Sequence, residues 1–178
     1  MLLATDIQYS DAGRGDAAYS GDRATAAGVL FSSWIDDECD RTLTKEITGV
    51  APYEPGSFYK RELPCLLALL SDINLDELTA IVVDGYVVLG EAQKPGLGMH
   101  LYEAIDRVLP VIGVAKNKFA DTPESCEVLR GNSQSPLFVT SVGIPLEIAK
   151  ANIAGMHGEH RMPTMLKKVD QLCRGILV

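Results

Sequence analysis

Apolar and polar residues alternate along the first half of the chain in a pattern that predicts three strands and then a helix. Strands are expected at residues 2–9, 24–35 and 41–50, and the polar loops between them suit an antiparallel meander. Leucines and an isoleucine then recur at helical spacing over residues 60–73. A helix is therefore expected to follow the three strands.

The second half alternates short apolar runs with amphipathic segments. Strands are expected at 80–84, 110–116 and 136–143, and helices at 98–109, 145–154 and 163–173. This order predicts an α/β fold of the ribonuclease-H-like type, a mixed sheet of three antiparallel strands and then parallel strands, with flanking helices. A length of 178 residues without repeat or linker indicates that residues 1–178 form a single domain.

The buried strand at residues 80–84 ends in a carboxylate, Asp84, and Gly85 then allows the chain to turn at once. A charge at the end of a core strand is costly unless something pairs with it. Metals and substrates commonly lie at the carboxyl ends of sheet strands, so Asp84 is a candidate for chemistry. An aspartate that simply caps the turn is the alternative interpretation.

Three more charged residues are expected near Asp84. The first and fourth strands are neighbours in this architecture, so Asp6 and Asp84 would face each other and repel unless a divalent cation neutralises them. Glu62 could add a third oxygen from the following helix, although the helix dipole alone could account for its place. Lys116 would lie at the same sheet edge and could stabilise a phosphoryl transition state. Oxygen ligands favour Mg²⁺, with Mn²⁺ as a substitute, over zinc.

The amino-acid composition constrains the cellular compartment and the partners of the protein more than it constrains its activity. The net charge of −8 argues against broad, sequence-independent binding of nucleic acid. It does not exclude a metal-dependent nuclease, because the active site of such an enzyme needs carboxylates. No apolar run reaches membrane-spanning length, and the N-terminus lacks the basic segment of a signal peptide. Four scattered cysteines indicate neither a zinc site nor a disulfide framework. We expect a cytoplasmic monomer with no membrane partner.

Several motifs resemble the endonuclease V (deoxyinosine 3′-endonuclease) family. They are Pro52-Tyr53-Glu54-Pro55-Gly56, Arg61-Glu62 with Pro64, Val83-Asp84-Gly85, Ile112-Gly113-Val114-Ala115-Lys116, Ser141-Val142-Gly143 and Arg161-Met162-Pro163. The resemblance extends from Thr5 to Arg174. It implies a magnesium-dependent endonuclease that cuts DNA or RNA at the second phosphodiester on the 3′ side of inosine.

The resemblance also implies roles for five charged residues. By position, Asp6, Glu62 and Asp84 would bind the metal and Lys116 would be the catalytic lysine. Asp170 matches a place where the family has Asp or His near the metal. A plain surface acid is the alternative interpretation of Asp170.

A further set of residues is implied to contact the substrate: Pro52, Tyr53, Gly56, Gly85, His100 and Gly113. Tyr53 would be a wedge that fills the gap left when a base is turned out of the stack. A tyrosine packed in a rigid turn is the alternative. The three glycines would let backbone approach the base closely and form its pocket.

The chain departs from the family pattern around the expected base pocket. Tyr86-Val87 stands where the family continues with His-Gly, and Ile144 stands where it tends to have His. Two alternatives therefore stay open beside inosine cleavage. One is a ribonuclease-H-like nuclease with a different target, and the other is a nucleic-acid-binding homologue that has lost catalysis.

Overall fold

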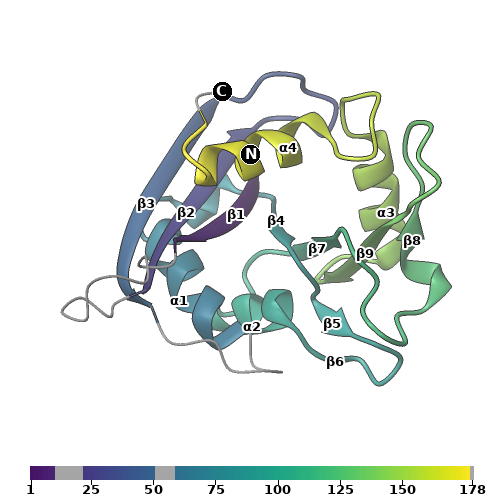
Figure 1. The fold of residues 1–178 in the computed structure, drawn as a ribbon, viewed down its shortest axis with the longest axis horizontal. Coiled ribbons are helices and arrows are strands. Elements are labelled where there is room, and N and C mark those ends of the chain that lie inside the picture. The colour runs from purple at the N-terminus through teal and green to yellow at the C-terminus, as the bar shows by residue number, and fades with distance from the viewer. Residues whose placement is uncertain (11–21, 51–58, 177–178) are drawn as a thin grey trace.

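The computed structural model describes residues 1–10, 22–50 and 59–176, which leaves the candidate wedge turn with Pro52, Tyr53 and Gly56 outside the described residues. One seven-stranded sheet organises the molecule, in the strand order β3-β2-β1-β4-β7-β9-β8 (Figure 1). Its strands are β1 (Leu2–Ser10), β2 (Asp22–Phe31), β3 (Arg41–Val50), β4 (Ala80–Asp84), β7 (Val111–Ala115), β8 (Glu127–Val128) and β9 (Leu137–Val142).

The strand directions confirm the expected mixed sheet. β1, β2 and β3 pair antiparallel, and β4 and β7 then continue parallel to β1. β9 runs antiparallel to β7 instead of parallel, and β8 returns beside it. A parallel return needs a long crossover, usually through a helix, whereas the segment between β7 and β9 holds only a 3₁₀ turn, η2 (Glu124–Cys126), and β8.

Helices cover both faces of the sheet. They are α1 (Tyr59–Leu70), α2 (Leu97–Ala104), α3 (Leu146–Gly155) and α4 (Thr164–Cys173), with a further 3₁₀ turn η1 (Leu75–Glu77). Alternate residues of a strand face opposite sides, so Leu3 and Ile81 pack toward α1 and α2, while Ala4 and Val82 pack toward α3 and α4. Two apolar cores therefore hold the central strands in place.

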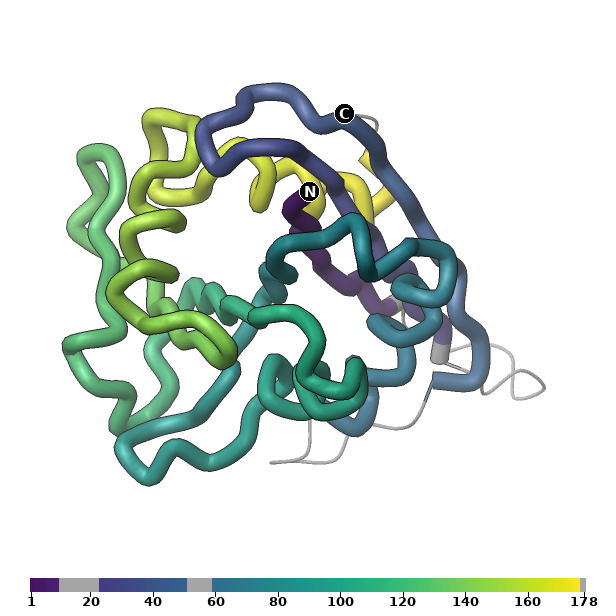
Figure 2. The backbone as a smooth tube through the Cα atoms, turned by 180° about the vertical axis from the view of Figure 1, so that it is seen from behind, coloured from purple at the N-terminus to yellow at the C-terminus, as the bar shows by residue number. Residues whose placement is uncertain are grey.

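The two ends of the chain come together on one face of the sheet. α4 contacts β1 and β2, and Figures 1 and 2 show the yellow C-terminal helix beside the purple N-terminal strand. This packing brings the last helix to the strand that carries Asp6. None of the helices in the described ranges is long and apolar enough to span a membrane.

The second strand is shorter than predicted. β2 ends at Phe31 because the carboxylate of Asp36 accepts hydrogen bonds from the backbone amides of Ser32 and Ser33, at 3.1 and 2.7 Å. Those amides are then unavailable for strand pairing. Trp34, predicted within the strand, instead packs against the core from the turn.

The helix predicted at residues 98–109 ends early, at Ala104. Asp106 and Arg107 adopt positive φ angles of 55° and 61°, which a helix cannot contain. Between β4 and this helix the chain forms a small hairpin of β5 (Val88–Leu89) and β6 (Lys94–Pro95).

Candidate active site

Three carboxylates from distant parts of the chain converge at one edge of the sheet. The last pair of residues in the parallel β1–β4 ladder is Thr5 and Val83. Asp6 and Asp84 come directly after them, one on each strand. Asp170 reaches them from α4, and one oxygen of each carboxylate lies within 4.8 Å of the others. The order of the elements predicted Asp6 beside Asp84, the family resemblance implied Asp170 near them, and the structure brings all three together.

Lys116 lies among these acids, one residue beyond the end of β7. Its Nζ donates hydrogen bonds to Asp84 Oδ2 at 2.8 Å and to Asp170 Oδ1 at 3.1 Å. Burial alone would lower the pKa of Lys116, but the hydrogen bond and charge of Asp84, with help from Asp170 and Asp6, raise it overall. Lys116 is therefore a fixed positive charge within the acidic group.

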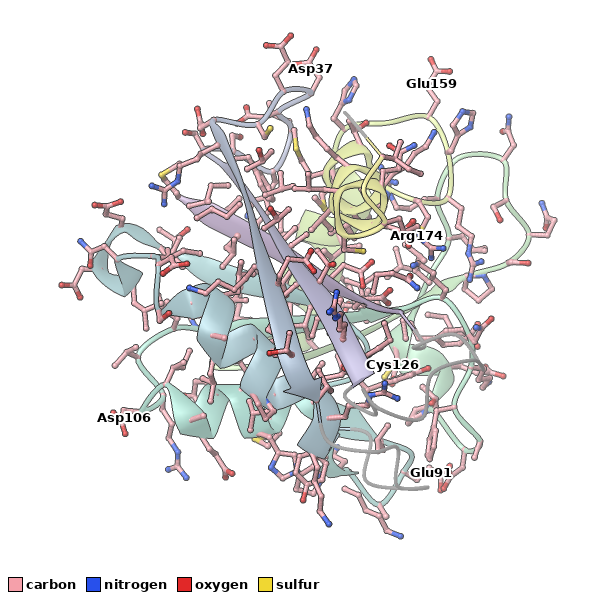
Figure 3. All side chains as sticks on the ribbon, turned by 60° about the vertical axis from the view of Figure 1, so that its left-hand side comes forward. Asp37, Glu91, Asp106, Cys126, Glu159 and Arg174 are labelled. Atoms are coloured by element: carbon pink, nitrogen blue, oxygen red, sulfur yellow. The ribbon has the colours of Figure 1, made fainter. Side chains whose placement is uncertain are left out.

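Arg174 holds the other side of Asp170. Its Nε and Nη2 donate to the two carboxylate oxygens, both at 3.1 Å, from one helical turn further along the chain. Figure 3 labels Arg174 at the end of α4. Burial works against the charge of Asp170, but hydrogen bonds from Lys116 and Arg174 lower its pKa overall. The sequence contained a signal for Arg174, its spacing of four residues from Asp170, that sequence reasoning missed.

Glu62 is not part of the group formed by Asp6, Asp84 and Asp170, but its side chain lines the same cavity. Its side chain comes from the first turn of α1, is 7% exposed, and lines a cavity with Asp6 and Asp84. Its Oε2 is buried and has no hydrogen-bond partner within the described ranges. Burial and the charges of Asp84 and Asp6 raise the pKa of Glu62 to about 8. Burial and Asp84 likewise raise the pKa of Asp6 to about 7.

These acids line an open cavity of about 370 Å³. Several of its other lining residues are not among the site residues predicted from the sequence: Gln8, Tyr9, Tyr86, Asn117 and Arg174. The guanidinium of Arg61 lies 3.9 Å from the centre of the Tyr9 ring, a cation–π contact at the cavity wall.

The donor set fits a hard divalent cation. It offers only carboxylate oxygens, which Mg²⁺ and Mn²⁺ prefer, and at least one of them is buried without a partner among the described residues. The raised pKa values of Asp6 and Glu62 show that the site disfavours its own negative charge. A cation would remove that penalty.

The chain matches the family model described as Endonuclease V over residues 7–170. It is also 32% identical over 186 aligned positions to the endonuclease V of Streptomyces avermitilis, covering 91% of this chain and 78% of that relative. The chain belongs to the endonuclease V family. This membership makes it a hydrolase of the endonuclease class.

Solved structures show that this endonuclease V family member has the family's fold. The Bacillus subtilis endonuclease V superposes with a TM-score of 0.74 and 17% identity, over 98% of this chain and 79% of that one. The Ciona intestinalis endonuclease V, in complex with DNA containing an inosine followed by a ribo-adenosine, superposes with a TM-score of 0.70 and 18% identity, over 98% and 84% of the two chains.

The glycines expected around the base have different surroundings. Gly85 has a φ of 135° and lines the open cavity, and a Cβ placed on it would meet no described atom within 4 Å. At Gly113, a Cβ would lie 2.6 Å from the carbonyl oxygen of Gly85 and 2.7 Å from the amide nitrogen of Val87. In this endonuclease V family member, the chain's own backbone thus occupies the space beside Gly113 that the sequence predicted for the base.

His100 lies between two helices. Its ring stacks on that of Tyr59, with the centroids 3.6 Å apart and the planes at 18°, so it joins α2 to α1. This stacking gives His100 a structural role in the described part of the molecule. Its expected contact with substrate stays a prediction.

Proposed function

We propose that this chain is a metal-dependent endonuclease that hydrolyses a phosphodiester near inosine, a deaminated base, in DNA or RNA. The observation that carries the proposal is the convergence of Asp6, Asp84 and Asp170 with Lys116 in one open cavity of an endonuclease V family member. The inosine-containing DNA held by the Ciona relative supports inosine as the target base.

We propose Asp6, Glu62 and Asp84 as the ligands of Mg²⁺, with Mn²⁺ as a substitute and Asp170 beside them. Support comes from the buried Oε2 of Glu62, which has no partner among the described residues, and from the raised pKa values of Glu62 and Asp6. The bound cation supplies Lewis-acid chemistry and an activated water. The protein itself supplies the placement of the oxygen ligands on two strands and a helix.

Lys116 has a separate proposed task. Its ammonium remains charged and is held by Asp84 and Asp170 at the cavity, where it can stabilise negative charge that develops on the phosphodiester. Asp170 orients that ammonium, and Arg174 keeps Asp170 in place and ionised. Asp84 and Asp170 therefore orient the ammonium of Lys116 as well as balance its charge.

Cleavage of defined oligonucleotides tests this function. The native protein, with Mg²⁺, should nick inosine-containing DNA or RNA and leave matched adenine controls intact. EDTA and the Asp84→Ala variant should each abolish the product. If the native protein cuts no substrate at all, the proposal is wrong.

A nuclease with a different target is the second candidate. It is favoured by the space beside Gly113, which the backbone of Gly85 and Val87 fills, and by Val87, which is fully buried. Cutting of other modified bases or of structured RNA, without cutting at inosine, would select this candidate. Absence of Mg²⁺ and Mn²⁺ binding by calorimetry would instead favour a non-catalytic nucleic-acid-binding protein.

We also propose that residues 1–178 form a single domain that works as a monomer in the cytoplasm. The four free cysteines support a reducing compartment. Light scattering should give a mass near 19.2 kDa, and a dimer mass would contradict the monomer.

A further inference from the structure

The segment 116–119 carries Lys116 out of the sheet and into the cavity. Two side chains from distant parts of the chain bind its main chain. The first is Tyr86, which follows β4 by two residues and is 9% exposed. Its hydroxyl donates to the carbonyl of Asn117 at 2.8 Å and accepts from the amide of Phe119 at 3.1 Å. The ring of Tyr86 also meets that of Phe119 edge-on, at a centroid distance of 6.2 Å.

The second is Arg161, from the loop before α4. Its Nη2 donates to the carbonyl of Lys116 itself and to that of Pro136, the latter at 2.7 Å. Arg161 therefore joins the two ends of the connection between β7 and β9. The loop that presents Arg161 is in turn held by Arg130, a buried guanidinium that donates to the carbonyls of Gly158, His160 and Arg161.

These contacts matter because a lysine ammonium is carried on a flexible four-carbon stem. Where the ammonium lies depends on how firmly the backbone at its base is held, and connecting segments are usually the more mobile parts of a fold. Here the carbonyls of Lys116 and Asn117 are bound by different side chains. The base of Lys116 is thus fixed from two sides.

We infer that Tyr86 and Arg161 are positioning residues, which together fix the main chain of residues 116–119 and so direct the ammonium of Lys116 toward Asp84 and Asp170. The inference rests on the proposed catalytic task of Lys116. It gives a role to Tyr86, one of the positions at which this chain departs from its family's pattern. Neither side chain needs to touch the reacting atoms for this effect.

A double-mutant cycle tests whether Tyr86 acts through Lys116. Tyr86→Phe removes only the hydroxyl, and we expect kcat to fall about 10-fold with KM changed by less than about twofold, because a small misplacement of a catalytic group slows the chemical step. In single-turnover assays with the Lys116→Met background, Tyr86→Phe should lower the residual rate no further. An equal loss with and without Lys116 would overturn the inference.

Arg161 is tested by graded substitution. Arg161→Met should lower kcat at least as much as Tyr86→Phe, and Arg161→Lys, which keeps a donor, should recover part of the loss. Tyr102→Phe, in α2, and Arg107→Met, at an exposed ion pair with Glu103, are matched controls that should keep native kcat. Native kcat in Arg161→Met, or no recovery in Arg161→Lys, would contradict the inference for Arg161.

Hydrogen exchange supplies a readout that needs no activity. The amide of Phe119 donates to the Tyr86 hydroxyl, so Tyr86→Phe should accelerate exchange at residues 117–119 while leaving α1 unchanged. Unchanged exchange there would refute the inference. If the native protein cuts nothing, the proposed function fails, and exchange still shows whether Tyr86 holds the segment. If it cuts and Tyr86→Phe is fully active, only the inference fails.

Discussion

At the scale of single residues, the position of Glu62 disfavours the charged form of its carboxylate. Glu62 is 7% exposed, and its Oε2 has no partner among the residues that the structure describes. Burial, Asp84 and Asp6 raise its pKa to about 8, so in the absence of a cation it is mostly protonated at neutral pH. Metal binding would therefore release protons from the site.

The pKa of Glu62 predicts how the stability of the metal-free protein depends on pH. The raised pKa means that the folded state holds a proton which the unfolded chain, with an ordinary pKa of 4.5, releases. The free energy of unfolding should therefore fall as pH rises from about 4.5 to 8, and Asp6 should add to this fall up to about pH 7. Glu62→Gln should make the fall smaller, as measured by urea unfolding in EDTA at pH 5 and pH 8.

The matched control for Glu62→Gln is Glu91→Gln. Glu91 is an exposed acid at the periphery of the molecule in Figure 3, so its variant should keep the native pH dependence. Equal pH dependence in the native protein and in Glu62→Gln would show that Glu62 is not the group responsible.

At the scale of elements, close backbone contact fixes the turn after β4 against β7. The carbonyl of Gly85 and the amide of Val87 approach Gly113, and the Val87 amide also donates to Thr140 Oγ1 at 2.8 Å. The neighbouring strands β4, β7 and β9 are thereby tied together at the turn that follows Asp84. Only glycine leaves room for this approach.

Gly113→Ala should therefore destabilise the fold. Its new methyl would meet backbone atoms at 2.6 and 2.7 Å, which cannot move aside cheaply, and we expect a loss of about 1–3 kcal/mol. Gly155→Ala at the end of α3, where nothing described lies within 4 Å, should be neutral or slightly stabilising. Chemical denaturation of both variants measures the difference, and equal stabilities would contradict the packing argument.

The loop between α3 and α4 is organised by one side chain. Arg130 is 5% exposed and donates to five carbonyls, those of Ala154, Met156, Gly158, His160 and Arg161. A loop without regular hydrogen bonding thus has its carbonyl groups satisfied by a guanidinium. The shape of the loop depends on Arg130 more than on its own residues.

Arg130→Met should cost about 3 kcal/mol or more of stability, because it leaves several carbonyls without donors in a partly buried loop. Thermal and urea unfolding measure this loss. Arg107→Met should change stability by less than about 0.5 kcal/mol, because its side chain is 67% exposed. A loss in Arg130→Met no larger than in Arg107→Met would show that the fold does not need the hydrogen bonds of Arg130.

At the scale of the whole molecule, the acidic group forms only when both ends of the chain are in place. Asp6 lies in the first strand, Asp84 in the fourth and Asp170 in the last helix. A cation bound among them would tie these elements together, and it would bind the folded chain in preference to the unfolded one. Metal binding should therefore stabilise the protein globally.

Mg²⁺ at ten times its dissociation constant should add about 1.4 kcal/mol of stability. For a chain of this size that raises the melting temperature by roughly 3–5 °C. Asp84→Asn should lose most of this increase, whereas Asp106→Asn, at an exposed acid that lies well away from Arg174 in Figure 3, should keep it. Differential scanning calorimetry with and without Mg²⁺ measures the shifts. An undiminished increase in Asp84→Asn would exclude Asp84 as a ligand.

The sequence by itself determined the types of most elements and the positions of the main charged residues. Hydrophobic periodicity is a local property, so it identified the strand that ends at Asp84, the strand before Lys116 and the inward face of α1 that carries Glu62. The order of those elements then made Asp6 and Asp84 neighbours. Local rules were sufficient because each of these residues lies at an element end or on a buried face.

Other contacts were decided only by the tertiary structure, because neither periodicity nor the order of the elements predicts them. The antiparallel direction of β9, the place of Asp170 beside Asp6 and Asp84, and the backbone packed against Gly113 all depend on contacts between segments far apart in sequence. The hydrogen bonds of Tyr86 to residues 117 and 119 are of the same kind. Such contacts leave no periodic trace along the chain, because they arise from the packing of finished elements against one another.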